Sequence, residues 1–422
     1  MKHVVKSPRG TRDIIGAALA PFLLLEKISR EKACLWGFEE IRFPSFEHAQ
    51  LFEKGTGDTT DIVEKEMYVF EDRGGRKLAL RPEGTPSVVR AYIENNLSSI
   101  RKKAALFYIG SMFRAERPQA GRYREFEHIG FEYFGDAQAY ADFEVMCLAN
   151  SILVEFGIKP KFWVSSIGCP QCRKPYSVSV RSSLKDIEAQ LCQDCKRRIE
   201  KNPLRALDCK ICSHKTAQLA PPFSKCDACA GHEQNLLDLL KASNVPYELN
   251  PKIVRGLDYY TRTVFEITAT DDPASIAIGG GGRYDGLVEV FGGPKTPAAG
   301  FAFGADRVVE ALAGTQQGTA NEKEKPVSER IFLTSAADNP EVISHVVGTA
   351  QKLRGDGVAA ELSILTDSLK SQLRQAGKSG ARFCATIGEE EVKSGEFSFK
   401  NFVTGESKKL LYEAMVKHVK NA

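Results

Sequence analysis

The first 160 residues alternate between helical and strand-like patterns of hydrophobic and polar positions. Apolar residues recur with helical spacing in Pro21–Trp36 and in Asp142–Phe156. Four shorter runs are typical of strands: Tyr68–Phe70, Leu78–Arg81, Ala105–Ser111 and Phe126–Tyr133. Because the strands follow one another as hairpins and not as strand-helix-strand repeats, the pattern predicts an antiparallel sheet flanked by helices.

This pattern stops after residue 160 and returns after residue 244. Strand-like runs then occupy Asp258–Thr270, Ser275–Gly279 and Ala299–Phe303, and a helix is expected over Asp306–Ala313. We therefore expect residues 1–160 and 245–315 to form one domain of α+β class, interrupted by an insertion over residues 161–244.

The last part of the chain has a different organisation. Residues 316–329 are polar and irregular, which predicts a flexible linker. Beyond them, strand-like and helical stretches alternate in βαβ fashion, which predicts a separate α/β domain over residues 330–422. The strand-like runs are Ile331–Thr334, Ala360–Ile364 and Phe383–Ile387, and the helical ones are Pro340–Gly355 and Ser368–Ser379.

Composition is that of an ordinary globular protein, with 42% hydrophobic and 27% charged residues. No apolar stretch reaches the roughly 20 residues that a membrane span needs. The N-terminus also lacks the pattern of a secretory signal, so we expect a cytoplasmic protein without membrane contact. The net charge of +4 permits a nucleic-acid partner without requiring one. Basic residues concentrate in residues 161–231, which hold 13 Lys and Arg against 6 Asp and Glu.

That basic segment also holds eight of the 11 cysteines, arranged as four C-x-x-C pairs. In a reducing compartment this clustering favours metal ligation over disulfide bonds. Four thiolates suit tetrahedral zinc and leave no open position, so the predicted zinc is structural. Eight thiolates suffice for two zinc ions, and the alternatives are a single site or reduced thiols without metal. The predicted ligands are Cys169, Cys172, Cys192, Cys195, Cys209, Cys212, Cys226 and Cys229.

An arginine-rich segment, YIGSMFRAERPQAGRYREF, runs from Tyr108 to Phe126. Its arginines are spaced too closely for a solvated helix face. A guanidinium group offers planar, permanently charged donors that suit a phosphate, so Arg114 on a strand could hold a nucleotide. A surface hairpin with incidental charge is the alternative interpretation.

Three further motifs carry possible ligand contacts. LRPEGT places Glu83 at a tight turn, where its carboxylate could bind an ammonium group. GGGGRYDGL lets the backbone approach a ligand closely, but it lacks the spacing of a phosphate-binding loop. GFAFGADR places Arg307 in the first turn of a helix, where the helix dipole disfavours a cation unless it faces a polyphosphate.

Together these motifs resemble the histidyl-tRNA synthetase family of class II aminoacyl-tRNA synthetases. IVRGLDYYTRTVFE and GGGGRYDGLVEVFGG are similar to its two histidine-specific signatures. FRAERPQAGRYREF and GFAFGADR are similar to class II motifs 2 and 3. The resemblance extends to PRGTRD at Pro8–Asp13, to a motif 1 proline at Pro44 and to the C-terminal α/β domain, so it covers nearly the whole chain.

The resemblance implies activation of L-histidine with ATP and Mg²⁺, then transfer to the 3′ end of tRNA(His). It also implies a homodimer whose C-terminal domain reads the anticodon. Arg114, Arg255 and Arg307 would act on the ATP phosphates, with Arg122 also contacting ATP. The implied tRNA contacts are Arg117 and Gln119. The implied histidine pocket comprises Glu83, Gly84, Thr85, His128, Glu132, Arg255, Tyr259, Tyr260 and Tyr284.

One position departs from the family pattern. The family has a glutamine four residues before the pocket glutamate Glu132, whereas this sequence has His128. A neutral imidazole can form a hydrogen bond, but it lacks the donor and acceptor of a single amide group. The alternative is that His128 merely packs beneath the site.

Two other functions deserve comparison with the synthetase interpretation. A non-catalytic histidine-sensing paralogue, similar to the regulatory subunit of ATP phosphoribosyltransferase, would typically lack the C-terminal domain and the ATP-binding arginines. This sequence retains both features. A zinc-ribbon RNA-binding protein would explain only the cysteine-rich segment.

Overall fold

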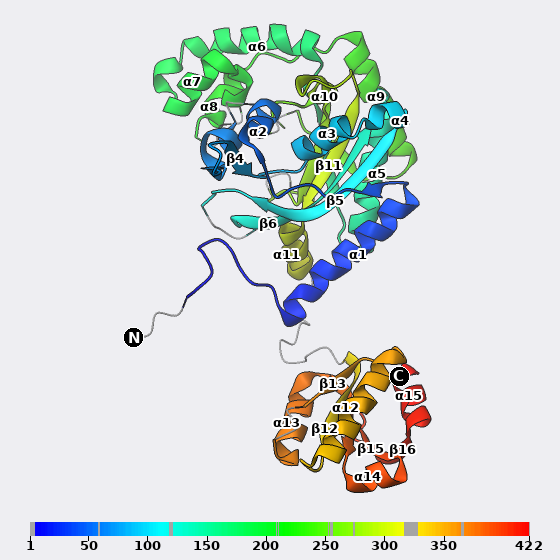
Figure 1. Ribbon diagram of the computed structural model, residues 1–422. Helices are drawn as coiled ribbons and strands as arrows, with labels where there is room; N and C mark the ends of the chain where they lie inside the picture. The colour runs from blue at the N-terminus through cyan, green and yellow to red at the C-terminus, as the bar shows by residue number, and fades with distance from the viewer. Residues whose placement is uncertain are drawn as a thin grey trace. The chain divides into compact units, whose positions relative to one another are not determined.

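The computed structural model describes residues 5–57, 60–117, 121–207, 209, 211–251, 253, 256–272, 275–315, 328–363 and 367–421. The chain forms two compact units, residues 1–317 and 318–422 (Figure 1). No helix among the described residues is both long and apolar enough to cross a membrane.

The first unit is built around an eight-stranded sheet of order β1-β5-β6-β11-β10-β9-β7-β8. β5 (Ala104–Phe113) and β6 (Glu125–Phe134) form an antiparallel hairpin, and β11 (Ala298–Gly304) pairs with β6. β9 (Thr261–Thr268) and β10 (Gly279–Arg283) complete an antiparallel meander with β11. The predicted antiparallel sheet is confirmed; parallel pairing occurs between β1 and β5 and between β7 and β8.

The strand predicted at Ser275–Gly279 is wrong, because β10 begins at Gly279 and continues through the run of glycines. Glycine has a low strand propensity, but pairing on both sides overrides it here. A side chain would not fit between the neighbouring strands. A Cβ added to Gly281 would lie 2.1 Å from the carbonyl oxygen of Gly300.

Helices cover both faces of the sheet (Figure 1). α1 (Ala20–Leu35) and α5 (Ala139–Glu155) pack against the face that carries Phe107. α3 (Thr85–Glu94) packs against the opposite face, which carries Tyr108, because successive strand residues point to opposite sides. The remaining elements of this part of the unit are η1 (Gly16–Leu19), β1 (Glu39–Glu40), β2 (Phe46–His48), α2 (Ala49–Thr56), η2 (Ile62–Glu66), β3 (Val69–Glu71), β4 (Lys77–Leu80), α4 (Leu97–Ile100), α10 (Leu287–Val290) and α11 (Ala305–Thr315).

The segment between β7 (Lys161–Ser166) and β8 (Tyr247–Leu249) is helical. The sequence analysis assigned no elements there. A small core that includes Val180, Leu184 and Ile199 holds these helices together, with Cys195, Cys209 and Cys212 in the same cluster. The elements are α6 (Pro170–Lys185), η3 (Glu188–Gln190), α7 (Gln193–Lys201), η4 (Pro203–Ala206), α8 (Ser213–Leu219) and α9 (Asp227–Ala242).

The second unit contains a five-stranded sheet of order β13-β12-β14-β15-β16. The predicted βαβ arrangement is present, although the predicted strand end at Ile364 lies outside the described residues. The antiparallel strands β15 and β16 had not been predicted. The elements are β12 (Ser328–Ser335), α12 (Pro340–Gly355), β13 (Ala360–Leu362), α13 (Leu369–Ser379), β14 (Ala381–Ile387), α14 (Glu389–Ser394), β15 (Glu396–Asn401), β16 (Ser407–Leu411) and α15 (Tyr412–Lys420).

A buried ion pair joins the end of β10 to α5. The side chain of Arg283 is fully buried and donates to Asp142 Oδ2 from Nε at 3.0 Å and from Nη2 at 2.5 Å. It also donates to Asp285 Oδ1 at 2.9 Å. Burial disfavours ionised Asp142, but hydrogen bonds from His232 and Arg283 hold the pKa of this carboxyl below its ordinary value. The pair therefore remains charged inside the protein.

We expect Arg283→Ala to destabilise the first unit by about 3–5 kcal/mol, because the substitution leaves a buried carboxylate without its main partner. Urea unfolding followed by tryptophan fluorescence would measure the loss. Arg101→Ala is the control, since Arg101 pairs with Glu39 at the surface and should leave the unfolding midpoint near that of the wild type. Equal midpoints for the two variants would contradict the expectation.

Candidate active site

A cavity of about 480 Å³ opens beside the central strands of the first sheet. Gly84 lies in the chain between two of its lining residues, Glu83 and Thr85. Arg117 is exposed and does not line the cavity, whereas Arg255 and Gln119 lie outside the described residues. The cavity brings together ten of the predicted site residues: Glu83, Thr85, Arg114, Arg122, His128, Glu132, Tyr259, Tyr260, Tyr284 and Arg307.

One end of the cavity is acidic and lined with hydroxyl groups. Glu132 is 1% exposed and accepts hydrogen bonds from Thr85 Oγ1 at 2.6 Å and from the Tyr284 hydroxyl at 2.5 Å. Glu83, 4% exposed, accepts a hydrogen bond at 2.8 Å from the Tyr259 hydroxyl. Two carboxyl groups are thus held in fixed positions with few rotational choices, as a cationic or N–H-bearing ligand would require.

Glycines make room for this acidic end. In the antiparallel register Gly300 lies opposite Glu132, and a Cβ on Gly300 would lie 2.0 Å from Glu132 Oε2. The ring of Tyr108 occupies the space that side chains at Gly84 and Gly130 would fill, each 2.2 Å from Tyr108 Cζ. Gly84 therefore serves packing of the wall and does not require a ligand contact to explain it.

Burial dominates the ionisation of Glu132. It raises the pKa of this carboxyl to about 8, although the hydrogen bonds from Thr85 and Tyr284 act in the opposite direction. The negative charge of Glu83 raises the pKa further. Glu132 therefore carries a proton in the ligand-free protein at pH 7, and a cation bound between the two carboxyls would favour its ionised form.

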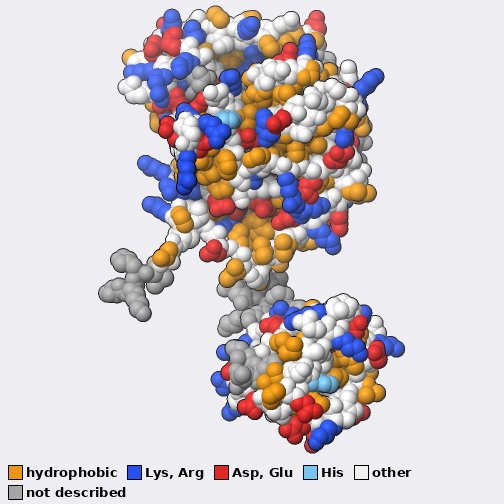
Figure 2. Space-filling model, in the orientation of Figure 1, with side chains coloured by type: hydrophobic (Ala, Val, Ile, Leu, Met, Phe, Trp, Pro, Cys, Tyr) orange, Lys and Arg blue, Asp and Glu red, His pale blue; other side chains and the backbone are white. Residues whose placement is uncertain are grey.

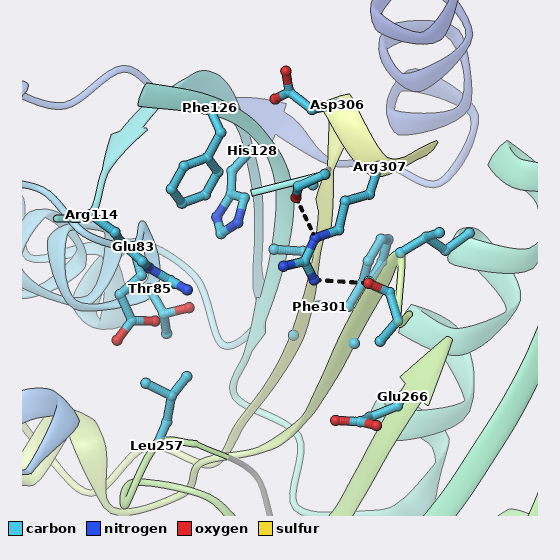
Figure 3. Close-up of a pocket in the computed structure, with 18 of the residues that line it drawn as sticks. Glu83, Thr85, Arg114, Phe126, His128, Leu257, Glu266, Phe301, Asp306 and Arg307 are labelled. Atoms are coloured by element: carbon cyan, nitrogen blue, oxygen red, sulfur yellow. Dashed lines mark hydrogen bonds between the residues drawn. The ribbon is translucent and has the colours of Figure 1, made fainter. Parts of the chain in front are cut away.

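The other end of the cavity is basic. Arg114 and Arg307 point toward each other across it (Figure 3). Arg114 Nε donates to the carbonyl oxygen of Pro82 at 2.9 Å. Arg307 donates from Nε to Gly121 and from Nη1 to Ala277, both at 2.9 Å. Since these bonds leave other guanidinium N–H groups to face the cavity, the two arginines can bind an anion between them.

Arg307 is the third residue of α11, where the helix dipole is unfavourable for a cation. Burial lowers the pKa of Arg307, and the positive charges of Arg122 and Arg114 lower it further. The preceding residue, Asp306, pairs with Arg12 and accepts a hydrogen bond from the backbone N–H of Glu127 at 3.0 Å. The positive charges of Arg114, Arg122 and Arg307 thus lie close together at this end of the cavity. A polyanion would stabilise this arrangement.

His128 lies on β6 next to the basic end (Figure 3). Burial, with the positive charges of Arg114, Arg307 and Arg81, holds the pKa of His128 well below its ordinary value. The imidazole is therefore neutral at pH 7. Its Nδ1 is buried and has no hydrogen-bond partner among the described residues. One ring nitrogen thus remains able to bond to a ligand.

Tyr108 lines the cavity and is 2% exposed, but it was not among the predicted site residues. A signal for it exists, because Gly130 lies opposite Tyr108 in the β5–β6 hairpin and leaves room for the ring. That signal can be read only once the hairpin register is known. The register depends on the length of the loop between the two strands.

The eight paired cysteines form two groups, each with its four sulfur atoms within 4.8 Å of one another. One group joins Cys169, Cys172, Cys226 and Cys229, and the other joins Cys192, Cys195, Cys209 and Cys212. Sγ–Sγ distances of 3.7, 3.8 and 4.0 Å in the first group exclude disulfide bonds there. The pairing is nested: the outer two C-x-x-C pairs meet, and so do the inner two.

The chain is similar to known proteins over nearly its whole length. The family model for histidyl-tRNA synthetase matches residues 25–167 and 209–308, and the model for an anticodon binding domain matches residues 327–422. Histidine-tRNA ligases of Pelotomaculum thermopropionicum and Aquifex aeolicus are 42% and 43% identical, covering 98% and 96% of this chain and 97% and 98% of their own lengths.

A solved structure of apo Staphylococcus aureus histidyl-tRNA synthetase is similar with a TM-score of 0.80 and 31% identity. It covers 99% of this chain and 100% of its own. The antiparallel sheet flanked by helices, with this structural similarity and the family match, is that of a class II aminoacyl-tRNA synthetase. The chain belongs to the histidyl-tRNA synthetase family. It is a ligase that joins histidine to tRNA with ATP and Mg²⁺, so the non-catalytic alternative is not supported.

We expect Glu132→Gln to stabilise the protein increasingly as the pH rises. Because the pKa of Glu132 is about 8 in the folded protein, against an ordinary value of 4.5, the folded state binds more protons than the unfolded state between these values. Wild-type stability therefore falls as the pH rises through this window, a term that glutamine lacks. Thermal unfolding should give similar midpoints near pH 5 and a higher midpoint for the variant at about pH 8.5. A difference independent of pH would show that Glu132 ionises normally.

Proposed function

We propose that histidine binds at the acidic end of the cavity and ATP at the basic end. The observation that carries this assignment is the convergence of Arg114 and Arg307 in the same cavity as Glu83 and Glu132. Glu83 would bind the α-ammonium group, and Glu132 with Thr85 would hold the substrate through hydrogen bonds. Tyr259, Tyr260 and Tyr284 would form the walls around the imidazole.

In this proposal Arg114 binds the α-phosphate and Arg307 the γ-phosphate region of a bent ATP, with Arg122 as a further contact. Arg255 would stabilise the charge that develops at the α-phosphate. The attacking group is the carboxylate of histidine, which is already ionised at pH 7, so this step needs no general base. The side chains would act by positioning and by electrostatic stabilisation, as expected for in-line attack on phosphorus.

We assign His128 a pocket role in place of the family's glutamine. Its neutral imidazole and its buried Nδ1 support a single hydrogen bond to a substrate. The donor and acceptor of an imidazole lie on different sides of the ring, so one His128 cannot reproduce both contacts of an amide. Gly84, by contrast, would act by admitting Tyr108 and not by contacting histidine.

For tRNA, we propose that Arg117 and Gln119 contact the acceptor end and that residues 330–422 read the anticodon. The exposure of Arg117 beside the cavity supports the first assignment, and the match to an anticodon binding domain supports the second. Residues 1–160 and 245–315 would form the catalytic domain, residues 161–244 an insertion domain, and residues 316–329 the linker. We further propose a cytoplasmic homodimer, on the resemblance of the motif 1 region around Pro44.

Each cysteine group fits one structural zinc ion. A regular tetrahedron with Zn–S bonds of about 2.3 Å has S–S edges of about 3.8 Å. The Cys192–Cys209 distance is 3.8 Å, and the distances of the other group lie close to the same value. Cys169, Cys192 and Cys226 each precede a helix, where the N-terminal dipole favours thiolates. When bound, zinc would cross-link these turns.

Zinc would also change the charge of the insertion. Two tetrathiolate sites would each carry −2, which lowers the balance of residues 161–231 from +7 to about +3. Lys and Arg side chains already lie among Asp and Glu over the insertion helices at the top of the first unit (Figure 2). Arg197 pairs with Asp194 at 2.6 Å, for example. Electrostatic attraction of tRNA to the insertion would therefore be modest.

Histidine-dependent exchange of pyrophosphate into ATP tests the assignment of the cavity. We expect exchange with histidine alone among the twenty amino acids. Arg114→Ala and Arg307→Ala should each lower kcat by about 10²–10³-fold, because each removes a charge aimed at the phosphates. Arg101→Ala is the matched control, because Arg101 pairs with Glu39 and neither residue lines the cavity. This variant should retain wild-type exchange. Exchange unaffected by either cavity substitution would refute the assignment.

Metal analysis of the purified protein tests the cysteine groups. We expect two zinc ions per chain in the wild type, one in Cys209→Ser and one in Cys226→Ser, because the nested pairing places these residues in different sites. Cys384→Ser, which removes a buried cysteine of the second unit, should retain both ions. Loss of both ions from a single ligand variant would contradict two independent sites.

A further inference from the structure

The segment Gly256–Tyr260 connects the insertion side of the chain to β9 and contains no helix or strand. It directly follows Arg255 in the sequence and carries Tyr259 and Tyr260 into the wall of the cavity. We call these five residues the histidine segment, a name that rests on the function proposed above. The position of the two tyrosine rings depends on whatever holds this backbone in place.

Side chains from the inner part of the insertion hold the middle of the histidine segment. The Asp258 carboxylate lies 3.2 Å from Arg205 Nε and accepts a hydrogen bond from Asn202 Nδ2 at 3.0 Å. Arg205 also donates from Nη2 to the carbonyl oxygen of Gly256 at 2.5 Å. Arg205 is only 8% exposed, so these charge-assisted contacts are largely shielded from water.

A second arginine holds the far end of the segment. Arg173, which directly follows the C-x-x-C pair of Cys169 and Cys172, donates from Nη1 to the carbonyl oxygen of Tyr260 at 2.7 Å. Burial lowers the pKa of Arg173, while the charge of Asp258 acts in the opposite direction. The residues that hold the histidine segment from the insertion side thus lie next to, or between, the cysteine pairs.

The surroundings of the segment make these contacts important. A cavity of about 850 Å³ lies beside it, lined by Leu257 and Asp258 together with Arg173, Asn202 and Arg205. On the catalytic side, the Asp258 backbone N–H donates to Thr56 at 3.1 Å. Leu257 and Tyr259 also pack against the small cluster that contains Tyr260, so polar contacts and apolar packing together fix the segment.

The inner cysteine group flanks the turn that carries Arg205. Asn202 and Arg205 occur between Cys195 and Cys209, two members of that group. The same region is tied to the catalytic part by Arg198, which donates to Asp61 at 2.9 Å. Zinc bound to the inner group, as proposed above, would restrict the orientations in which Arg205 faces Asp258.

We propose that Arg205, supported by Asn202 and Arg173, is a positioning residue for histidine activation. It does not line the active-site cavity and acts through Asp258, which orders the segment bearing Tyr259. The insertion then contributes to amino-acid binding in addition to any contact with tRNA. Loss of the contact should mainly affect histidine, because the arginines assigned to ATP are held by Pro82, Gly121 and Ala277 instead.

Pyrophosphate exchange with Arg205→Ala tests the proposal. We expect the KM for histidine to rise about tenfold, comparable to losing a hydrogen bond between charged groups, with the KM for ATP nearly unchanged. The matched control is Arg181→Ala, because Arg181 lies in the same insertion and donates to the carbonyl oxygens of Ile199 and Glu200 but not to the histidine segment. Equal effects of the two substitutions, or no effect of Arg205→Ala, would overturn the proposal.

A double-mutant cycle with Asp258→Asn distinguishes positioning of the histidine segment from a general loss of folding stability. If Arg205 acts through Asp258, the double variant should be no worse than the more severe single variant. Additive losses would overturn the proposal. Both variants should retain the wild-type zinc content, whereas Cys209→Ser should lose one zinc and also raise the KM for histidine. Failure of wild-type exchange with histidine would instead refute the function proposed for the cavity.

Discussion

The pairing of β6 with β11 is the constraint on which the rest of the active site depends. These strands lie on opposite sides of the insertion in the sequence, yet their register places Glu132 opposite Gly300. Because Gly300 has no side chain, the Glu132 carboxyl can occupy the space above that strand. A shift of one residue would turn Glu132 to the other face of the sheet, against the hydrophobic residues around Phe131 and Phe301. The acidic pocket therefore exists only in this register of β6 and β11.

The cavity beside this sheet contains two different electrostatic environments, one at each end. Glu83 and Glu132 are surrounded by hydroxyl groups at one end, whereas Arg114 and Arg307 converge at the other. Without ligands, burial disfavours the charged form of a side chain at each end. It raises the pKa of Glu132 to about 8 and lowers the pKa of Arg307. Both energetic costs would fall when a cationic group and a polyanion bind together. The ligand-free protein thus holds these side chains in an arrangement that a bound cation and a bound polyanion would stabilise.

Hydrophobic patterns predicted the antiparallel sheet, and the resemblance of short motifs to the histidyl-tRNA synthetase family implied ten of the residues that line the cavity. Both kinds of signal are local features of the sequence. They failed where structure depends on distant neighbours. The strand at Gly279–Arg283 forms because β9 and β11 pair on its two sides, which outweighs the weak propensity of glycine. The room for Tyr108 depends on the β5–β6 register, and the cysteine pairing depends on how four helices pack. Spacing along the chain determines none of these three features.

The nested cysteine pairing explains how the insertion could be held in one conformation. The outer group joins the first and last C-x-x-C pairs, so it closes the insertion where the chain leaves and rejoins the catalytic part. The inner group then fixes a smaller turn that contains Arg205. With its outer ends joined, the insertion has fewer conformations available, and side chains on the inner turn can reach the histidine segment reproducibly. The insertion is helical, but its own hydrophobic core is small, because Val180, Leu184 and Ile199 belong to a cluster of eight buried residues of which three are cysteines. Cross-linking by metal would therefore make a marginal insertion rigid enough to support amino-acid binding in the neighbouring cavity.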